Sequence, residues 1–450
     1  MSAGLLRLAQ EAQGDDWLAA LRQQGRAAWQ GFSLPDRKTE QWKYTSLAAL
    51  KKHDFILSEK SSAHVAVEPS SMFAQDKMLA RVVFIDGHFS AETSSLDNLA
   101  EGLEIFRLSE ATPRQQIWLT EHVNIGINLE QHGFAALNTS TLTDGICVRV
   151  KAGTPPQHII QVMHVSTVRE QGHYHAPRTV VSLEGGCDAT VVEHFIGINS
   201  NINSANYFCN ALTELSIGAN ARLRYYRLHD DAEPALHIGG VHAHLDADSR
   251  LDSFVLLPGS ELQRLDFVVN YTGQGAEAAV NGIYFPAGTQ HVDLHTNIEH
   301  AVPHCTTQEN FRGIVSDRAR AVFNGRIHIH PQAQKTEAYL SNKNLLTSNK
   351  AEVDTKPELE IYADDVRCAH GATIAQLDTM ALHYLRTRGI GQVEARRMLS
   401  FGFINELVEA IAEPWVADYC RASVLRAFAT DANLFSDSAH RDIDVDEVNA

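Results

Sequence analysis

The sequence lacks the motifs that mark several large protein classes. It contains no Gly-x-x-x-x-Gly-Lys-Ser/Thr segment and no Gly-rich loop joining a strand to a helix, so we expect this chain to bind no nucleotide and to have no ATPase activity. No uncharged apolar run approaches ~18 residues, which predicts that no helix spans a membrane. The first residues also lack a secretory pattern, so we expect a cytoplasmic protein.

Cysteine is scarce, and basic charge is outweighed by acidic charge. The six cysteines are scattered without a Cys-x-x-Cys pair, which argues against a disulfide framework and favours reduced thiols. The formal net charge of −17 argues against nucleic acid as a partner, because phosphate-binding surfaces are usually basic. Histidine is abundant, with 23 residues, and this raises the question of a metal site.

The chain divides into four regions by its pattern of residues. Residues 1–145 are predicted to be a helical and mixed α/β region, with apolar residues at near-helical spacing up to about residue 60. Residues 146–372 alternate short apolar runs with Gly, Asn and Asp, which predicts a β region without a long helix. Residues 373–430 are predicted to form a helical domain and residues 431–450 an acidic, disordered tail.

Small or polar turns recur in the β region and indicate stacked repeats. Residues 218–221, 246–249 and 273–276 each lead into a predicted strand, and the spacing of such turns lies near multiples of about 14–15 residues. We interpret one such unit as two strands with two tight turns, which would form one coil of a flattened parallel β-solenoid. A β-sandwich with similar turns remains the alternative on this observation alone.

Three helices are predicted after the β region. Asp378 can cap a helix over about 379–388, and Gly389 can end it in a left-handed conformation. A second helix fits residues 392–412, and Pro414 suits the first turn of a third. The second helix carries an apolar stripe of Phe401, Ile404, Leu407, Val408 and Ile411. This stripe either packs within its own domain or contacts a partner, and the sequence favours neither.

The densest group of metal-capable residues lies between residues 291 and 305. If this segment begins with a strand, His291, Asp293 and His295 face the same side, and two imidazoles with one carboxylate suit Zn²⁺ or Fe²⁺. A solvated polar face explains the alternation as well, and we favour it. Three further metal-capable residues come next in the chain: His300, His304 and Cys305. Alternating pairs on other strands are interpreted as surface residues: His173 with His175, His242 with His244, and His328 with His330.

A second candidate site lies where the β region gives way to the helices. Cys368 and His370 stand two residues apart, and a thiolate with an imidazole suits iron better than cations that prefer only oxygen ligands. Two ligands do not complete a metal site, so a partner chain would have to supply the others. A buried thiol beside a hydrogen-bonded histidine explains the pair equally well at this point.

Several motifs in close order resemble one protein family. They are Asn-Gly-Arg-Ile at 324–327, Gln-Lys-Thr-Glu-Ala at 334–338, Ser-Asn-Lys-Asn-Leu-Leu at 341–346, and the longer segments 351–361, 364–373 and 384–390. Over about residues 310–412 the chain is similar to the C-terminal half of the SufB/SufD scaffold proteins of iron–sulfur cluster assembly. The segment Lys-Thr-Glu-Gln-Trp-Lys-Tyr-Thr at 38–45 resembles the SufD side of that family.

The resemblance implies an architecture, partners and a site. It implies a right-handed parallel β-helix core between helical N-terminal and C-terminal regions. It implies a scaffold in complex with a SufB-like paralogue and with SufC, an ABC-type ATPase that binds the C-terminal helices, or a homodimer when the chain is isolated. A transient iron–sulfur cluster is expected at the interface with SufB. The implied ligand is His370, with Cys368 in the same motif, and Ala369 replaces a frequent serine with little consequence for ligation.

Two other functions stay open. A β-solenoid enzyme acting on polysaccharide would need paired carboxylates on one face, and Asp246 with Asp248 are the candidates, although they lie in a predicted turn. A histidine-rich metal-dependent enzyme would use residues 291–305. Co-purification with SufB and SufC, cleavage of polysaccharide, or stoichiometric metal on the isolated chain would distinguish the three functions.

Overall fold

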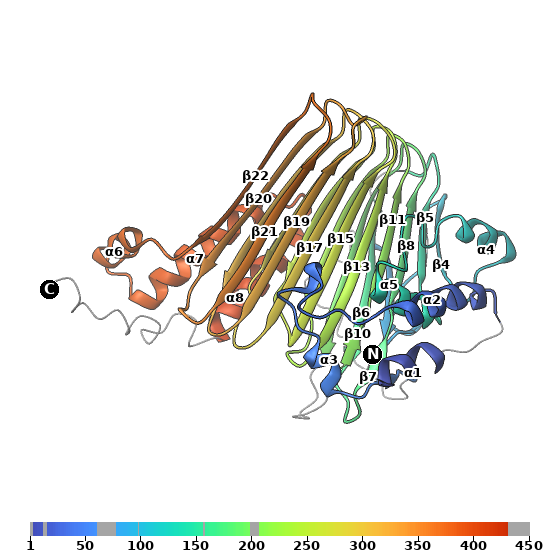
Figure 1. The fold of residues 1–450 in the computed structure, drawn as a ribbon, viewed down its shortest axis with the longest axis horizontal. Coiled ribbons are helices and arrows are strands. Elements are labelled where there is room, and N and C mark those ends of the chain that lie inside the picture. The colour runs from blue at the N-terminus through green and yellow to red at the C-terminus, as the bar shows by residue number, and fades with distance from the viewer. Residues whose placement is uncertain are drawn as a thin grey trace.

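The computed structural model describes most of the chain. It covers residues 3–11, 16–60, 78–97, 99–155, 158–198 and 207–430. The predicted tail, residues 431–450, lies outside these ranges. The described part forms a β-solenoid of about seven turns with helices at both ends (Figure 1), which confirms the predicted fold class. Among the described helices, none combines the length and apolarity needed to span a bilayer.

Two sheets form the walls of the solenoid, and their successive strands run parallel. Sheet A has 12 strands: β1 (Ile56–Leu57), β4 (Leu103–Arg107), β5 (Ile146–Val150), β7 (His173–His175), β8 (Arg178–Leu183), β10 (Tyr207–Cys209), β11 (Leu212–Ile217), β13 (Leu236–Leu245), β15 (Leu262–Tyr271), β17 (His291–His300), β19 (Arg320–Ile329) and β21 (Glu352–Ile361). Sheet B has 10 strands: β2 (Met78–Ile85), β3 (His88–Phe89), β6 (His158–Thr167), β9 (Asp188–Ile198), β12 (Arg222–Asp230), β14 (Arg250–Leu257), β16 (Glu277–Tyr284), β18 (Thr306–Val315), β20 (Glu337–Leu346) and β22 (Arg367–Ala375).

One coil of the solenoid contains one strand from each sheet. Arg222 of β12 pairs with Arg250 of β14, so the step between neighbouring strands of one sheet is about 28 residues. The prediction that about 14–15 residues form a whole coil is therefore wrong, because that length covers only one strand and one turn. The predicted turns before Arg222, Arg250 and Glu277 stack at one corner of sheet B, whereas the turn before Arg320 belongs to sheet A.

Alternating side chains fill the space between the two sheets. In β17, Val292, Leu294 and Ile298 point inward and are buried, while most of the residues between them point outward and are partly exposed. The inward residues of successive coils form one continuous apolar core cluster. Because fully burying one such aliphatic side chain contributes ~1.5–3 kcal/mol, the stacking of coils supplies most of the stability of this region.

N-terminal elements cover one end of the solenoid and part of sheet A. They are α1 (Ala3–Glu11), α2 (Ala19–Gly31), the 3-10 helix η1 (Glu40–Trp42), α3 (Ala48–Lys52), α4 (Pro113–Thr120) and α5 (Gly133–Ser140). Residues 36–47, here called the strap, cross the outer face of sheet A (Figure 1). The Trp42 ring lies over the guanidinium of Arg264, with 3.8 Å from its carbon to the ring centroid. Glu40 of the strap forms an ion pair with Lys356 of β21 at 2.7 Å.

Three C-terminal helices confirm the sequence prediction. They are α6 (Thr379–Thr387), α7 (Gln392–Glu409) and α8 (Pro414–Thr430). The Asp378 carboxylate accepts a hydrogen bond from the Met380 amide at 2.8 Å, and Gly389 has the left-handed φ of 85° expected at the end of α6. The apolar stripe of α7, which includes the buried Ile404 and Val408, packs with α8 onto apolar residues of sheet B. The stripe is therefore occupied within this chain.

The two ends of the solenoid differ in how they finish. At the covered end, sheet A finishes at β4, which runs antiparallel to β5, and sheet B finishes at the β2–β3 hairpin. At the other end, here called the open end, the sheets finish at β21 and β22. Within the described ranges no strand pairs with the outer edges of β21 and β22, and both strands are largely exposed or half-buried.

Candidate functional site

The candidate site at Cys368 and His370 lies on β22, the last strand of sheet B at the open end. Cys368 pairs with Ala338 and His370 pairs with Leu340 across the β20–β22 ladder. Ala338 and Leu340 are buried and face the interior, so Cys368 and His370 point to the interior side as well. No further coil covers β22 in the part of the chain that the structure describes, and this leaves His370 exposed and Cys368 half-buried.

The Cys368 thiol is shielded by the edge of the core. It packs against the apolar core cluster, and this burial raises the pKa of Cys368. A raised pKa favours the neutral thiol, so a metal ion or a positive group beside it is needed to stabilise the thiolate. All six cysteines are free thiols, in agreement with the expected absence of a disulfide framework.

A buried polar network lies directly below β22 and was not predicted. Asn342 donates to the Tyr284 hydroxyl at 2.9 Å, and that hydroxyl donates to Asn344. The Thr355 hydroxyl of β21 donates to Asn342 at 2.9 Å, and Asn344 also donates to the carbonyl of Thr373 in β22 at 3.4 Å. The network therefore ties both end strands to the coil beneath them. Its sequence signal was the pair of asparagines at inward positions of β20, where the neighbouring strand β18 carries Phe311 and Gly313.

Residues His291, Asp293 and His295 share the outer side of β17 as predicted, but Arg264 contacts both Asp293 and His295, which lie 2.9 Å apart. The Arg264 guanidinium donates to the Asp293 carboxylate and to His295 Nε2 at 3.2 Å. Burial by itself would raise the pKa of Asp293, but Arg264 holds this pKa well below its usual range. The favoured interpretation, a solvated polar face, is wrong for Asp293, which is fully buried. Thr45 of the strap bonds His291 at 2.9 Å, so this group anchors the strap.

The other metal-capable residues of this segment do not join that group. His300 points inward, where its ring stacks on Tyr271 with centroids 4.4 Å apart and its Nε2 bonds the Thr307 hydroxyl at 2.9 Å. His304 lies in a turn with a φ of 62°, and Cys305 is buried at a corner. Because these residues face different sides, residues 291–305 form no common metal site.

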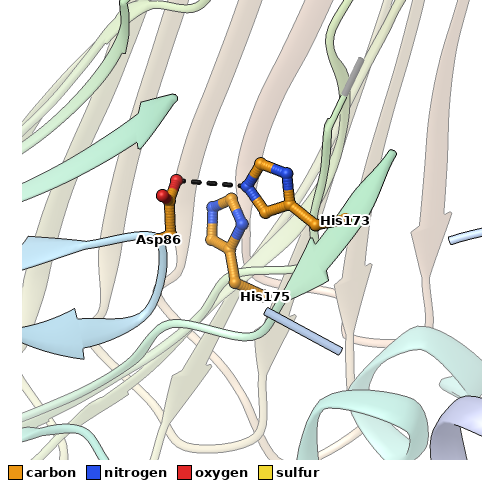
Figure 2. Close-up of side chains that lie close together, drawn as sticks. All are labelled: Asp86, His173 and His175. Atoms are coloured by element: carbon orange, nitrogen blue, oxygen red, sulfur yellow. Dashed lines mark hydrogen bonds and ion pairs between the residues drawn. The ribbon is translucent and has the colours of Figure 1, made fainter. Parts of the chain in front are cut away.

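The prediction that the remaining histidine pairs lie on the surface is wrong for His173, His175 and His242, which are buried. Figure 2 shows the Asp86 carboxylate directed at the His173 ring, with His175 beside it. The distance from Asp86 Oδ1 to His173 Nε2 is 3.1 Å. Burial lowers the pKa of His175 to about 3, so this imidazole is neutral at physiological pH. Among the described residues, three clusters bring metal-capable atoms within 4.8 Å of one another: Asp86–His173–His175, His229–Asp231–His237 and Glu299–His328–His330.

The carboxylates proposed for a polysaccharide enzyme lie in the predicted turn, between β13 and β14. Asp246 accepts a hydrogen bond from the adjacent Ala247 amide at 2.7 Å, and Asp248 has a left-handed φ of 54°. Asp248 supplies the left-handed residue that the tight turn requires, a conformation that Asp tolerates better than most residues. Their placement therefore has a local structural explanation.

The comparisons with known proteins agree with this architecture. The family model of the SufBD core domain of the SUF iron–sulfur cluster assembly system matches residues 165–403, and that of the SufBD N-terminal region matches residues 8–162. The chain is 31% identical to the iron–sulfur cluster assembly protein SufD of Escherichia coli, over 84% of this chain and 86% of that protein. It is 30% identical to a SufBD family protein of Synechocystis over 88% of each chain, and 24% identical to SufD of Bacillus subtilis over 64% of each.

Proposed function

The chain belongs to the SufBD family of iron–sulfur cluster assembly proteins, and from this premise we propose that it is a non-catalytic scaffold subunit of a cytoplasmic SUF complex. It pairs with a SufB-like paralogue through the open end of the solenoid and binds a SufC-type ABC ATPase through its C-terminal helices. It contributes to iron acquisition and to a transient cluster at the interface with the paralogue. The observation that carries this proposal is the open end itself.

The open end has the chemistry of an unfinished core. Inward positions of β21 and β22 carry apolar side chains, yet Ile361 is 41% exposed and Ile374 is 48% exposed. Both strands also present backbone N–H and C=O groups that natural proteins normally cover or protect with charge. A partner that adds its own strands would satisfy the backbone and bury the apolar side chains together. A paralogue with the same two-sheet solenoid meets both requirements.

Cys368 and His370 form half of a cluster site in this arrangement. They point toward the space that the paralogue would fill, and His370 is free of burial by this chain. The partner supplies the remaining ligands, because a thiol and an imidazole alone leave an iron ion under-coordinated. The cluster is cargo that leaves the complex. The site formed by Cys368 and His370 therefore stays accessible from one side, so that the cluster can be released.

The ATPase surface is placed on α6 and the first half of α7. The stripe of α7 is occupied by sheet B and α8, but Met380 is 73% exposed, Tyr384 is 58% exposed and Met398 is 46% exposed. Figure 1 shows α6 standing beyond the sheets at the open end. Exposed Met and Tyr side chains on a projecting helix are typical of a protein-binding surface.

The site assignment is tested with His370→Ala in the co-expressed complex of this chain, the paralogue and the ATPase. We expect iron and sulfide per complex to fall severely while recovery of the complex is unchanged. The substitution removes an exposed ligand but no packing contact. His304→Asn is the matched control, since it removes another exposed histidine at a position where Asn tolerates the positive φ. Normal iron and sulfide in recovered His370→Ala complex would rule out the ligand role.

The ATPase surface is tested with Met380→Asp and Tyr384→Asp. We expect both variants to lose the ATPase subunit in a pull-down and to keep the paralogue, because an unpaired charge opposes burial of α6. Leu425→Asp on α8, where Leu425 is 50% exposed, should keep both partners. The isolated chain should hydrolyse no ATP. Loss of the ATPase only in Leu425→Asp would move the surface to α8.

A further inference from the structure

A carboxylate and two imidazoles converge on the outer face of sheet A, away from the open-end site. The Nδ1 atom of His328 lies 2.7 Å from Glu299 Oε2, and the Nε2 atom of His330 lies 3.1 Å from the same oxygen. The other carboxylate oxygen of Glu299 is held by Arg326. Two ring nitrogens, one from β19 and one from the residue that follows it, therefore meet a single oxygen from the neighbouring strand β17.

The register of the sheet explains the convergence. Glu299 of β17 and His328 of β19 are direct partners in the parallel ladder, so their side chains stand side by side on the same face. His330 comes directly after β19, on the same side as His328, and the two rings lie 4.2 Å apart. The sequence could not place Glu299 here, because it lies 29 residues before its partner.

Solvent reaches this cluster, unlike the other two three-residue clusters. The side chains of His328, Glu299 and His330 are 18%, 22% and 35% exposed. Glu299 and His328 line a groove of about 680 Å³ together with Glu358 and Glu360. An aqueous cation can therefore approach without any unfolding, through a region that contains additional carboxylates.

The cluster in Figure 2 is a weaker metal site, because both oxygens of its carboxylate already accept hydrogen bonds from Thr167, whereas Glu299 Oε2 is approached by the two imidazoles and Arg326 is on the other oxygen. Asp86 accepts hydrogen bonds at 2.7 Å from both the amide and the hydroxyl of Thr167, and it forms an ion pair with Arg169. A divalent cation there would have to displace a Thr167 donor or the Arg169 guanidinium from a fully buried carboxylate. The Asp86 cluster is explained by its structural role in joining the β2–β3 turn to β6 and β7.

The buried cluster around Asp231 has no free lone pairs for a metal. Asp231 bonds the Nδ1 atoms of His229 and His237. Their Nε2 atoms face Arg227, at 3.1 Å and 3.4 Å. A fixed guanidinium therefore occupies the position that a cation would need.

We propose that Glu299, His328 and His330 bind a borderline divalent cation such as Zn²⁺ or Fe²⁺. One carboxylate and two imidazoles are ligands that these metals prefer over Mg²⁺ or Ca²⁺. In a tetrahedral site with bonds of about 2.0–2.1 Å, ligand atoms lie about 3.3 Å apart, so the two nitrogen-to-oxygen distances of 2.7 Å and 3.1 Å need to open by roughly half an ångström or less. Each imidazole moves its proton to the other ring nitrogen and offers the freed lone pair. The solvent side keeps open coordination positions.

The test uses the isolated full-length chain, treated with chelator and then titrated with Zn²⁺ in competition with a colorimetric chelator. We expect the wild type to bind one equivalent of Zn²⁺. In His328→Ala and in Glu299→Gln the Zn²⁺ affinity should fall by roughly tenfold or more, because each variant removes a ligand. Glu299→Gln keeps the side-chain volume. If His328→Ala lowers the melting temperature, Glu299→Gln therefore shows whether Zn²⁺ binding is lost through the missing ligand or through a destabilised fold. Co²⁺ bound to the wild type should show ligand-field absorption that both variants lose.

Two controls separate this site from the open-end site. His304→Asn and the double variant Cys368→Ala/His370→Ala should retain the equivalent of Zn²⁺. Absence of Zn²⁺ binding by the wild type, or wild-type affinity in both triad variants, would overturn the proposal. Loss of the equivalent only in the double variant would assign the metal to the open end instead. The experiment needs no partner, so its outcome is independent of the scaffold function proposed above.

Discussion

The covered and open ends of the solenoid have the same strand pattern but differ in how their last strands are protected. At the covered end, antiparallel strands finish both sheets, and the buried Asp86 fixes the hairpin turn to the neighbouring strands. At the open end the inward alternation continues to Ile361 and Ile374, and nothing among the described residues covers them. The chain caps one end itself and leaves the other uncapped among the described residues, where we propose that the partner binds.

The comparison of the ends is tested most strongly by charge. Ile361→Asp with Ile374→Asp should abolish co-elution with the paralogue, because burying unpaired charges costs ~3–5 kcal/mol. The isolated variant should keep its melting temperature, since both side chains are about half exposed. Ile117→Asp is the control at the covered end, where Ile117 is 70% exposed on α4 and should tolerate charge with pairing intact. Loss of pairing only in Ile117→Asp would reverse the roles of the ends.

A matched pair of truncations compares the same inward position in two coils. Ile327 of β19 and Leu359 of β21 are register partners, but Ile327 is fully buried and Leu359 is half-buried. Ile327→Ala should lower the free energy of unfolding by ~2–5 kcal/mol. Leu359→Ala should cost less than half as much in the isolated chain. Urea unfolding measures both, and equal losses would indicate that the open end is already packed.

The buried Glu309 between the two sheets should make the stability of the chain depend on pH. Burial raises the pKa of Glu309 to about 8, against the opposing effect of Thr296. The native state then holds its proton more tightly than the unfolded chain does, so this group's stabilising contribution is full below about pH 4.5 and is lost as pH rises toward 8. Glu309→Gln should be more stable than the wild type at pH 8 by a few kcal/mol, and the difference should shrink toward pH 4.5. A pH-independent difference in thermal or urea unfolding would contradict the burial of this carboxyl group.

The smallest effect is expected at the tip of the strap. Lys356 on β21 pairs with the exposed Glu40, and such ion pairs are screened by water and salt. Lys356→Met should leave the melting temperature unchanged within error and should not alter paralogue binding. A clear loss of stability would show that the strap, rather than coil stacking, holds the last strands in place.

The sequence predicted the elements that depend on local residue patterns. It did not predict the burial of residues that are covered by segments distant in the chain. Alternation and turns predicted the solenoid, and Asp378 with Gly389 predicted the bounds of α6. The common direction of Cys368 and His370 could be predicted from strand periodicity alone. The burial of His173 and Asp293 could not be predicted, because the segments that cover them, the Asp86 turn and the strap, come from distant parts of the chain.

The strap has a consequence for the order of folding. Glu40 and Lys356 are 316 residues apart, and the contact of Trp42 with Arg264 also waits for the middle coils. During synthesis the strap leaves the ribosome early, but its docking surface is complete only after β21 has formed. Trp42 packs on Phe134 and on Arg264 of β15, so its burial is complete only after β15 has formed and reports that the coils up to β15 exist. Chains that stall before β15 would keep part of this indole exposed, a feature that chaperones and proteases can recognise.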